Sequence, residues 1–244
     1  MKAFSLFALI VLAQSPAQAA DCVVFLHGLA RTSASMEKAA TAFENSGYTV
    51  ANVSYPSRKF PIEELAPLAI EAGLEKCPAN AVVHFVTHSL GGILVRYYLE
   101  HNEISNLGRV LMLAPPNRGS RVAKAVRSQP MFQWYFGPAG QELPDPAGWP
   151  APPPPFAVIA GTCNASAFAP PGLLARAAGV MPPDEPSDGI VTVAETRLEG
   201  MHDFATVNAS HTWIMNHPEA RAMVLAYLAD GRLRPRAGAV RGDC

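Results

Sequence analysis

Short apolar runs alternate with segments of helical spacing along most of the chain, and this alternation restricts the possible fold more than any other feature. The apolar runs lie at residues 22–27, 48–53, 81–88, 107–114 and 156–161. Strands that alternate with helices form a parallel sheet covered on both faces, and strands buried on both faces are apolar throughout. We therefore predict an α/β fold, with a mostly parallel sheet flanked by helices.

The expected helices lie at about residues 32–45, 61–77, 90–98, 119–127 and 218–230. Thr32 or Ser33 can cap the first of them, and Gly47 ends it. Pro61 opens the second, because proline is favoured in the first turn of a helix. After Ser89, apolar residues recur at helical spacing and predict the third.

Composition places the chain among single-domain globular proteins. The 244 residues are 49% hydrophobic, which is enough for one sizeable core, and we assign residues 20–244 to one domain. Nineteen Lys and Arg against twenty Asp and Glu leave a net charge of −1 with no basic block. Nucleic acid is therefore not expected as a partner.

The first residues have the pattern of a secretory signal peptide. Lys2 precedes an apolar run at residues 4–13, which is too short to span a bilayer. Residues 17–19, Ala-Gln-Ala, match a cleavage site. We predict a signal peptide at residues 1–19, a secreted or periplasmic protein, and no stable membrane insertion.

Four cysteines, Cys22, Cys77, Cys163 and Cys244, occur in the sequence. An even number in an exported protein suggests disulfides, and three pairings are possible. Cys22 and Cys77 each precede a predicted strand, so they can pair if those strands are neighbours. Cys163 and Cys244 would then hold the C-terminal tail. No pair has the spacing of a zinc site, and we predict no metal.

Residues 128–156 are rich in proline, glycine and aromatic side chains and predict a long loop. A loop of that length inside a compact domain is usually functional or mobile. Trp134, Tyr135 and Phe136 either pack onto the surface or line an apolar substrate cleft. We define residues 118–155 as a lid-like insertion.

The segment Val86 to Gly92, VTHSLGG, places Ser89 between a predicted strand and a predicted helix. A nucleophile on such a sharp turn needs small neighbours, and Gly91 and Gly92 meet that need. The backbone N–H of Leu90, at the start of the helix, can point at a developing oxyanion. We predict that Ser89 is a nucleophile.

A second oxyanion donor is expected after the first strand, where the sequence reads His27-Gly28-Leu29. On an open parallel sheet, functional groups gather at the carboxyl ends of the strands. We therefore assign the backbone N–H of Leu29 to this role. His27 itself is interpreted as structural.

A serine nucleophile needs a base, and the base needs a carboxylate that orients it. Asp188 lies in a turn before an apolar segment, and His211 follows the strand-like residues 205–210. The resulting order of serine, aspartate and histidine fits the elbow geometry. We favour Asp188 and His211. The alternatives that stay open are Asp184 and Asp203 for the carboxylate and His202 and His217 for the base, while His84 and His101 are interpreted as structural.

Five segments together, VVFLHGLARTSASM, VTHSLGG, RVLMLAPPNRGS, SDGIVTVAET and SHTWIM, resemble an α/β-hydrolase of the bacterial lipase and esterase type. They extend over nearly the whole chain after the signal peptide. The resemblance implies a triad of Ser89, His211 and Asp188, with the N–H groups of Leu29 and Leu90 as the oxyanion hole.

The same resemblance implies that the strands before His27 and Ser89 are neighbours, which supports the Cys22–Cys77 pairing. Thr87 departs from the family pattern, which has glycine at this position. Residues 118–155 form a shorter segment than the caps of large lipases, so interfacial activation is not expected.

The expected function is the hydrolysis of a small-molecule acyl ester or lipid without a cofactor. A thioesterase, an amidase or an acyltransferase would use the same triad. A secreted binding protein on an inactive hydrolase scaffold is the alternative from another class. The sequence does not indicate the acyl chain length or the oligomeric state.

Overall fold

A computed structural model describes residues 21–145, 149–153, 155–164, 179–181 and 184–234. The predicted signal peptide, residues 1–19, lies outside these residues. The strands are β1 (Cys22–Leu26), β2 (Thr49–Val53), β3 (Val83–His88), β4 (Leu107–Leu113), β5 (Phe156–Gly161) and β6 (Asp203–Val207).

The helices are α1 (Glu37–Glu44), α2 (Ile62–Leu74), α3 (Leu90–His101), α4 (Arg121–Val126), α5 (Pro130–Glu142), α7 (Val193–Thr196) and α8 (Pro218–Asp230). Two short 3₁₀ turns, η1 (Ser33–Ser35) and η2 (Ile214–Asn216), are the other elements of the residues that the structure describes. Within the described ranges, no helix has both the length and the apolar character needed to cross a membrane.

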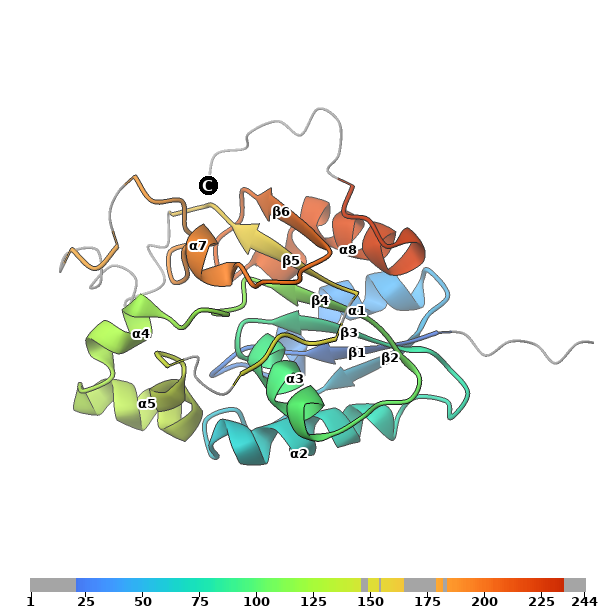
Figure 1. The fold of residues 1–244 in the computed structure, drawn as a ribbon, viewed down its shortest axis with the longest axis horizontal. Helices are drawn as coiled ribbons and strands as arrows, with labels where there is room; N and C mark the ends of the chain where they lie inside the picture. The colour runs from blue at the N-terminus through green and yellow to red at the C-terminus, as the bar shows by residue number, and fades with distance from the viewer. Residues whose placement is uncertain (1–20, 146–148, 154, 165–178, 182–183, 235–244) are drawn as a thin grey trace, which may run out of the picture.

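The six strands form one parallel sheet in the order β2-β1-β3-β4-β5-β6. All strand arrows therefore point to the same edge of the sheet, and α4 and α5 lie beyond that edge (Figure 1). The predicted α/β fold with a parallel sheet is confirmed.

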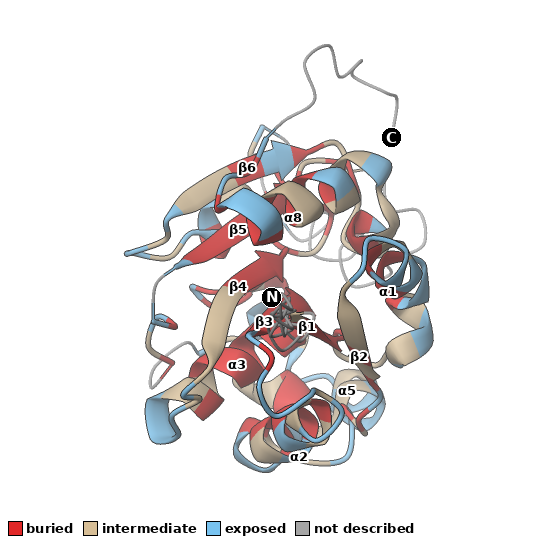
Figure 2. Cartoon of the chain, turned by 90° about the vertical axis from the view of Figure 1, so that its right-hand side faces the viewer, coloured by how far each residue is buried: buried red, intermediate tan, exposed pale blue. Residues whose placement is uncertain are grey.

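Helices cover both faces of the sheet, with α2 and α3 on one face and α1 and α8 on the other (Figures 1 and 2). Successive strand residues enter opposite cores because side chains alternate along a strand. In β1, Val24 and Leu26 pack with the residues of α2 and α3, whereas Val23 and Phe25 pack with those of α1 and α8. Both faces of the central strands are therefore buried, which is why the strands are apolar throughout.

The first helix begins later than predicted. Thr32 precedes the 3₁₀ turn η1 and makes no side-chain cap, and α1 starts only at Glu37. Ser35 Oγ donates to the Thr32 carbonyl at 2.8 Å. Such local side-chain bonds compete with a helical ladder, which accounts for the shift.

The predicted long loop at residues 128–156 is also wrong, because it contains α5. Pro130 occupies the first turn of α5, where proline is tolerated, and Phe132 packs against the core. Gly137, with a φ of 65°, forms a kink within the helix. A Cβ at this position would lie 1.9 Å from the Arg58 carbonyl oxygen, so the kink lets α5 contact the segment after β2.

Buried hydrogen bonds fix the ends of the insertion to the sheet domain. The Arg96 guanidinium on α3 donates to the carbonyls of Trp149, Pro150 and Asn117. Glu142, near the end of α5, accepts from the Ile62 N–H at the start of α2, at 2.9 Å. Burial lowers the pKa of Arg96 to about 10. The insertion is thus bound to α2 and α3 through main-chain contacts that sequence spacing does not reveal.

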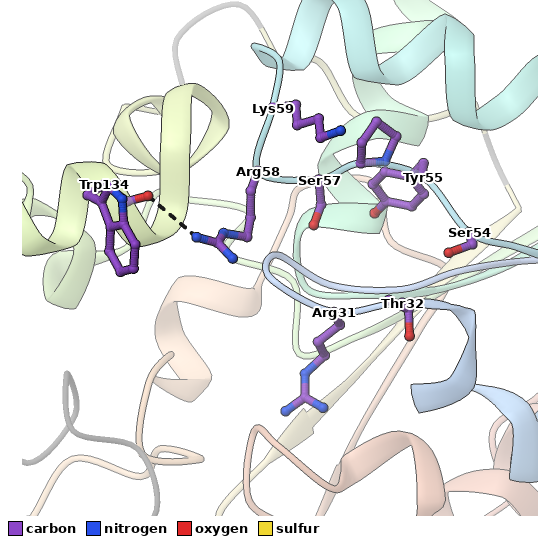
Figure 3. A pocket seen from close by; sticks show the side chains of 9 residues that line it. Arg31, Thr32, Ser54, Tyr55, Ser57, Arg58, Lys59 and Trp134 are labelled. Atoms are coloured by element: carbon purple, nitrogen blue, oxygen red, sulfur yellow. Dashed lines mark hydrogen bonds between the residues drawn. The ribbon is translucent and has the colours of Figure 1, made fainter.

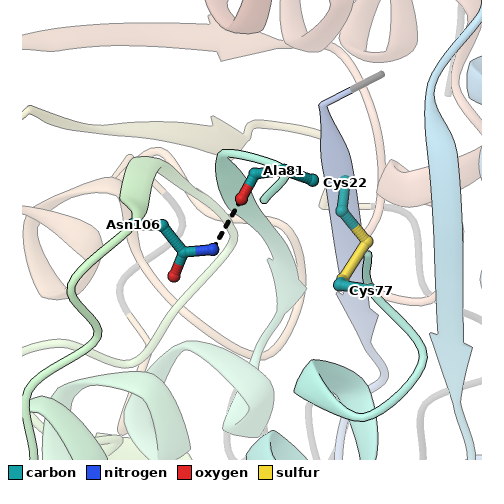
Figure 4. Close-up of a disulfide and its surroundings, with 4 residues drawn as sticks. All are labelled: Cys22, Cys77, Ala81 and Asn106. Atoms are coloured by element: carbon teal, nitrogen blue, oxygen red, sulfur yellow. Dashed lines mark hydrogen bonds between the residues drawn. A yellow bond between two sulfur atoms is a disulfide. The ribbon is translucent and has the colours of Figure 1, made fainter. Parts of the chain in front are cut away.

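Cys22 and Cys77 form a disulfide between the first residue of β1 and the segment that precedes β3 (Figure 4). This is possible because β1 and β3 are neighbours, with Cys22 opposite Val83. The disulfide lies at the amino ends of the strands, away from the edge at which they end. The second predicted pairing, Cys163–Cys244, includes a residue outside the described ranges.

Removing the Cys22–Cys77 disulfide by the double variant C22A/C77A should lower the stability without changing the sheet. The bond spans 55 residues of sequence. Its loss increases the conformational entropy of the unfolded chain. By the chain-entropy relation, the free energy of unfolding then falls by about 4 kcal/mol. We expect a decrease in Tm of about 10 °C. Calorimetry on the double variant measures the change, and an unchanged Tm would contradict the predicted contribution.

Candidate active site

Ser89 lies on the sharp turn between β3 and α3. Its backbone has φ 51° and ψ −117°, a conformation that residues other than glycine rarely adopt. The Ser89 N–H donates to the Leu113 carbonyl at the end of β4, at 2.9 Å. Such strain is characteristic of a nucleophile elbow, in which the turn raises the hydroxyl above the end of the strand.

The two glycines after Ser89 allow α3 to cross close to the sheet. A Cβ on Gly91 would lie 2.6 Å from the Leu26 carbonyl oxygen in β1. A Cβ on Gly92 would lie 3.2 Å from Thr87 Oγ1. The Thr87 hydroxyl in turn donates to the Leu111 carbonyl at 3.4 Å. The space left by Gly92 therefore accommodates threonine at a position where the motif usually has glycine.

Asp188 and His211 come from segments that follow β5 and β6 in the chain. Gly161, the last residue of β5, permits both segments to come close. A Cβ at Gly161 would lie 2.7 Å from Asp188 Cβ and 2.4 Å from the Ala209 carbonyl oxygen. The His211 N–H donates to the Asp188 carbonyl at 2.9 Å. The backbone thus holds the two segments side by side before their side chains interact.

The structure brings together Ser89, His211 and Asp188, which are distant in sequence. His211 Nδ1 lies 2.7 Å from Asp188 Oδ2, and His211 Nε2 lies 3.1 Å from Ser89 Oγ. Because the carboxylate only accepts, Nδ1 carries the proton and Nε2 is free to accept the serine proton. The imidazole therefore has the tautomer that a general base requires.

Two main-chain groups hold the Asp188 carboxylate. Asp188 Oδ1 accepts from the N–H groups of Ile190 and Val191, at 3.0 and 2.8 Å. The aspartate is fully buried and has Oδ2 left for His211. Its two oxygens thus have different partners, so the carboxylate is fixed in orientation.

The predicted oxyanion donors lie beside Ser89. Leu90 is the first residue of α3, and N–H groups in the first turn have no partner within the helix. Leu29 follows Gly28, where an added Cβ would lie 3.3 Å from Ser89 Cβ. Both residues therefore lie near the serine, at the carboxyl ends of the neighbouring strands β1 and β3, and their role as oxyanion donors stays a prediction.

His88 is a site residue that the sequence reasoning did not single out. Its Nε2 lies 2.9 Å from the His211 carbonyl oxygen and donates to it, because a carbonyl only accepts. Burial, together with the charges of His211 and Arg31, lowers the pKa of His88 well below its usual value. A neutral His88 therefore holds the main chain of His211. Its position beside Ser89 in VTHSLGG was the available signal.

The other acids and bases considered from the sequence lie elsewhere. Asp184 is exposed, and Asp203 and His202 lie at the amino-end edge of the sheet, where β6 begins. His217 occupies the N-cap position of α8 without a side-chain cap, and His101 lies at the end of α3, with Nδ1 2.9 Å from the Tyr97 carbonyl oxygen. His84 and His27 are buried, and their rings accept hydrogen bonds from the main-chain N–H groups of Arg109 and Tyr55, respectively. None of these seven lies among the residues that line the cleft around Ser89.

A cavity of about 680 Å³ opens beside Ser89 and His211. Its walls are mostly apolar and come from α4, α5 and the segment after Asp188. The apolar and aromatic lining residues are Leu29, Ala30, Pro116, Val122, Ala123, Val126, Met131, Phe132, Trp134, Tyr135, Phe136, Leu143, Ile190 and Val191. The cavity can therefore accept an apolar group that ends at the serine.

Known structures share this fold, although no family model matches the chain and no curated protein matches it in sequence. The mature lipase BlEst2 of Bacillus licheniformis has a TM-score of 0.65 and 19% identity, over 90% of this chain and 95% of the lipase. A metagenomic carboxyl esterase has a TM-score of 0.63 and 18% identity, over 93% of this chain and 76% of the esterase.

A type II thioesterase from the borrelidin biosynthetic cluster has a TM-score of 0.56 and 17% identity, over 91% of this chain and 96% of the thioesterase. At these identities the likeness concerns the fold alone.

The variant His88→Leu should change how stability depends on pH. Near pH 7.5 we expect the variant's free energy of unfolding to be lower by about 1–3 kcal/mol, because the His211 carbonyl loses its hydrogen-bond donor. Below about pH 6.5 the unfolded wild type binds a proton that the native state excludes from His88, so the wild type loses stability as the pH falls. Leucine does not titrate, so the difference in stability between wild type and variant should become smaller as the pH falls.

Denaturant midpoints near pH 7.5 and pH 5 measure this difference. His88→Gln is the matched control, because its amide keeps an N–H donor and should lose less at the higher pH. Stability curves for His88→Leu and wild type that stay parallel across this range would contradict a neutral, buried His88.

Proposed function

We propose that this chain, which has the α/β-hydrolase fold, is a serine hydrolase that cleaves carboxylic esters, as a lipase or esterase does. The position of the His211 imidazole carries the proposal, because Nε2 lies 3.1 Å from Ser89 Oγ and Nδ1 lies 2.7 Å from Asp188 Oδ2. A serine hydroxyl is a weak nucleophile until a base accepts its proton. Ser89 is the nucleophile, His211 the general base, and Asp188 the group that orients the base.

In the first step, Ser89 Oγ attacks the acyl carbonyl carbon while its proton passes to His211 Nε2. The carbonyl oxygen becomes an oxyanion, to which the N–H groups of Leu29 and Leu90 donate. The bond to the alcohol oxygen then breaks, and His211 gives its proton to that oxygen. The products are a free alcohol and an acyl ester on Ser89.

In the second step, water replaces the alcohol. His211 takes a proton from the water as the water oxygen attacks the acyl carbon, and the bond to Ser89 Oγ breaks. Ser89 recovers its proton from His211, and the acid leaves. Asp188 stabilises the imidazolium that forms in each step, and these steps use only groups of this chain.

The cavity beside Ser89 supports an acyl or alkyl group as the part of the substrate that binds there. Its volume of about 680 Å³ and its lining from α4 and α5 are suited to an apolar chain. The helices α4 and α5, which belong to the lid-like insertion, are in this proposal the wall that covers the apolar part of the substrate. The hydrogen bonds that Arg96 donates to Pro150 and that Glu142 accepts from Ile62 support a wall that is fixed in place.

Thioesterase activity is the second candidate, because the type II thioesterase of the borrelidin cluster shares the fold over 91% of this chain. The same triad also serves amidases and acyltransferases. Rates on an ester, a thioester and an amide with the same acyl group separate these activities. An ester rate that exceeds the other two supports the esterase assignment.

The disulfide between Cys22 and Cys77 supports a secreted or periplasmic location, because such bonds persist in oxidising compartments. A signal peptide at residues 1–19 would direct the chain there. Mass spectrometry of the exported protein, with a mature N-terminus near residue 20, tests both parts of this proposal.

Ser89→Ala should abolish ester hydrolysis, because no other group replaces the nucleophile. We expect kcat on a short p-nitrophenyl ester to fall by about 10⁴-fold or more. A fluorophosphonate probe should label the wild type and not the variant, since only an activated serine reacts readily. Ser46→Ala, at an exposed serine after α1, is the matched control. Full activity in Ser89→Ala would refute the proposal, and an unlabelled, inactive wild type would favour a binding protein.

Asp188→Asn tests the orientation of His211. The amide oxygen can still accept from Ile190 and Val191, but the amide nitrogen then faces His211 Nδ1 and cannot accept its proton. The imidazole must take the wrong tautomer, so we expect kcat to fall by about 10³- to 10⁴-fold with little change in KM. Steady-state kinetics measure both constants. A higher KM with an unchanged kcat would contradict the role given to Asp188.

A further inference from the structure

A second pocket adjoins the apolar cavity on the side of β1 and β2. It has a volume of about 640 Å³ and lies between the segment after β1, the segment after β2 and α5 (Figure 3). The lining residues are Arg31, Thr32, Ser54, Tyr55, Pro56, Ser57, Arg58, Lys59 and Trp134. Both segments follow the carboxyl ends of neighbouring strands, so this pocket opens at the same edge of the sheet as Ser89.

The lining has cations and hydroxyl groups but no carboxylate. Arg31, Arg58 and Lys59 supply positive charge, and none of the three forms an ion pair with any residue that the structure describes. Burial lowers the pKa of Arg31, which indicates that its half-buried guanidinium has lost part of its hydration. A charge in that position is stabilised by an anion beside it.

Contacts between the elements hold the pocket walls in place. The Ala30 N–H donates to Ser57 Oγ at 3.0 Å and joins the segments after β1 and β2. Arg58 lies against α5, with its guanidinium carbon 4.6 Å from the centre of the Tyr135 ring. An Arg58 N–H is directed at the Trp134 carbonyl, at 3.5 Å (Figure 3). The guanidinium of Arg58 is therefore positioned by aromatic contact.

The two pockets adjoin each other and share two lining residues. Arg31 and Trp134 line both of them. Arg31 also lies two residues after Leu29, the proposed oxyanion donor, and its charge contributes to lowering the pKa of His88 next to Ser89. A molecule whose ester group lies at Ser89 can thus extend into the apolar cavity on one side and toward Arg31 on the other.

We propose that the pocket formed by Arg31, Arg58 and Lys59 is a subsite for an anionic group, a carboxylate or a phosphate, carried by the ester substrate. The inference rests on the proposed hydrolase function and names its substrate class. The apolar part of the ester occupies the cavity beside α4 and α5, and the anionic part occupies the cationic pocket. No covalent step takes place at the subsite, which binds and orients the substrate.

Three esters with the same acyl group test the subsite. Hexanoylglycerol is neutral, hexanoylglycerol phosphate carries a phosphate, and hexanoylglycerate carries a carboxylate. We expect kcat/KM of the wild type to be about tenfold higher for at least one of the charged esters than for the neutral ester. The better of the two identifies the anion. Raising the ionic strength to about 0.5 M should reduce the preference, because salt screens the attraction.

Variants separate charge from packing. Arg58→Gln should reduce the preference several-fold, and R31Q/R58Q should abolish it, whereas Arg58→Lys keeps the charge and most of the preference. Lys76→Gln is the matched control, because it removes one exposed charge beside Cys77 at the opposite edge of the sheet. The measured quantity is the kcat/KM for the charged ester divided by that for the neutral ester. A general loss of activity lowers both values and leaves this ratio unchanged.

Binding gives a measurement that does not depend on turnover. Calorimetry with Ser89→Ala should show tighter binding of the charged ester, and this difference should disappear in the variant that also lacks both arginines. Equal kcat/KM values for charged and neutral esters, or a preference that survives R31Q/R58Q, would overturn the subsite and leave the hydrolase function standing. No hydrolysis of any ester, with selective binding retained, would overturn the function and leave the subsite standing.

Discussion

Six parallel strands end along one edge of the sheet, and the residues of the candidate triad and of the predicted oxyanion hole follow such ends. Ser89 follows β3, Leu29 follows β1, and the segments with Asp188 and His211 come after β5 and β6. Parallel pairing therefore brings together groups that are far apart in sequence. Close contact between α3 and β1, permitted by Gly91, then determines the height of the serine above that edge.

Hydrogen bonds that involve the main chain hold Asp188 and His211 in place. Asp188 is bound by two main-chain N–H groups, and the His211 main chain is bound by His88 and by the Asp188 carbonyl. A main-chain donor loses little freedom when it binds, so such partners hold a side chain in one orientation at low entropic cost. The proposed chemistry depends on this fixed orientation, because the imidazole must face the carboxylate and the serine at once.

The cavity and the cationic pocket concern the choice of substrate, and not the reaction itself. The apolar cavity owes its walls to α4 and α5, and the cationic pocket owes its charges mainly to the segment after β2. Arg31 connects them directly beside the proposed oxyanion hole. A substrate with an apolar arm and a charged arm matches both surfaces in this proposal, whereas a purely apolar ester would leave the half-buried Arg31 without an ionic partner among the described residues.

Local sequence predicted several elements to the residue. The strand Phe156–Gly161 and the helix Pro218–Asp230 lie where the apolar run and the leading proline placed them. The elbow at Ser89 was also predictable, because a strand, a serine and two glycines occur within a few residues. Each of these signals depends on nearby residues only, which is why sequence spacing was enough to find them.

The sequence by itself therefore determined the alternation of strands and helices, the serine elbow and a short list of acids and bases. Only the tertiary structure decided which of those meet: Asp188 and His211 approach Ser89, while Asp203 and His202 lie at the opposite edge. It also decided that residues 130–142 form a helix and that Arg31 faces two pockets. These outcomes depend on contacts between segments separated by tens of residues, and such contacts have no local pattern in the sequence.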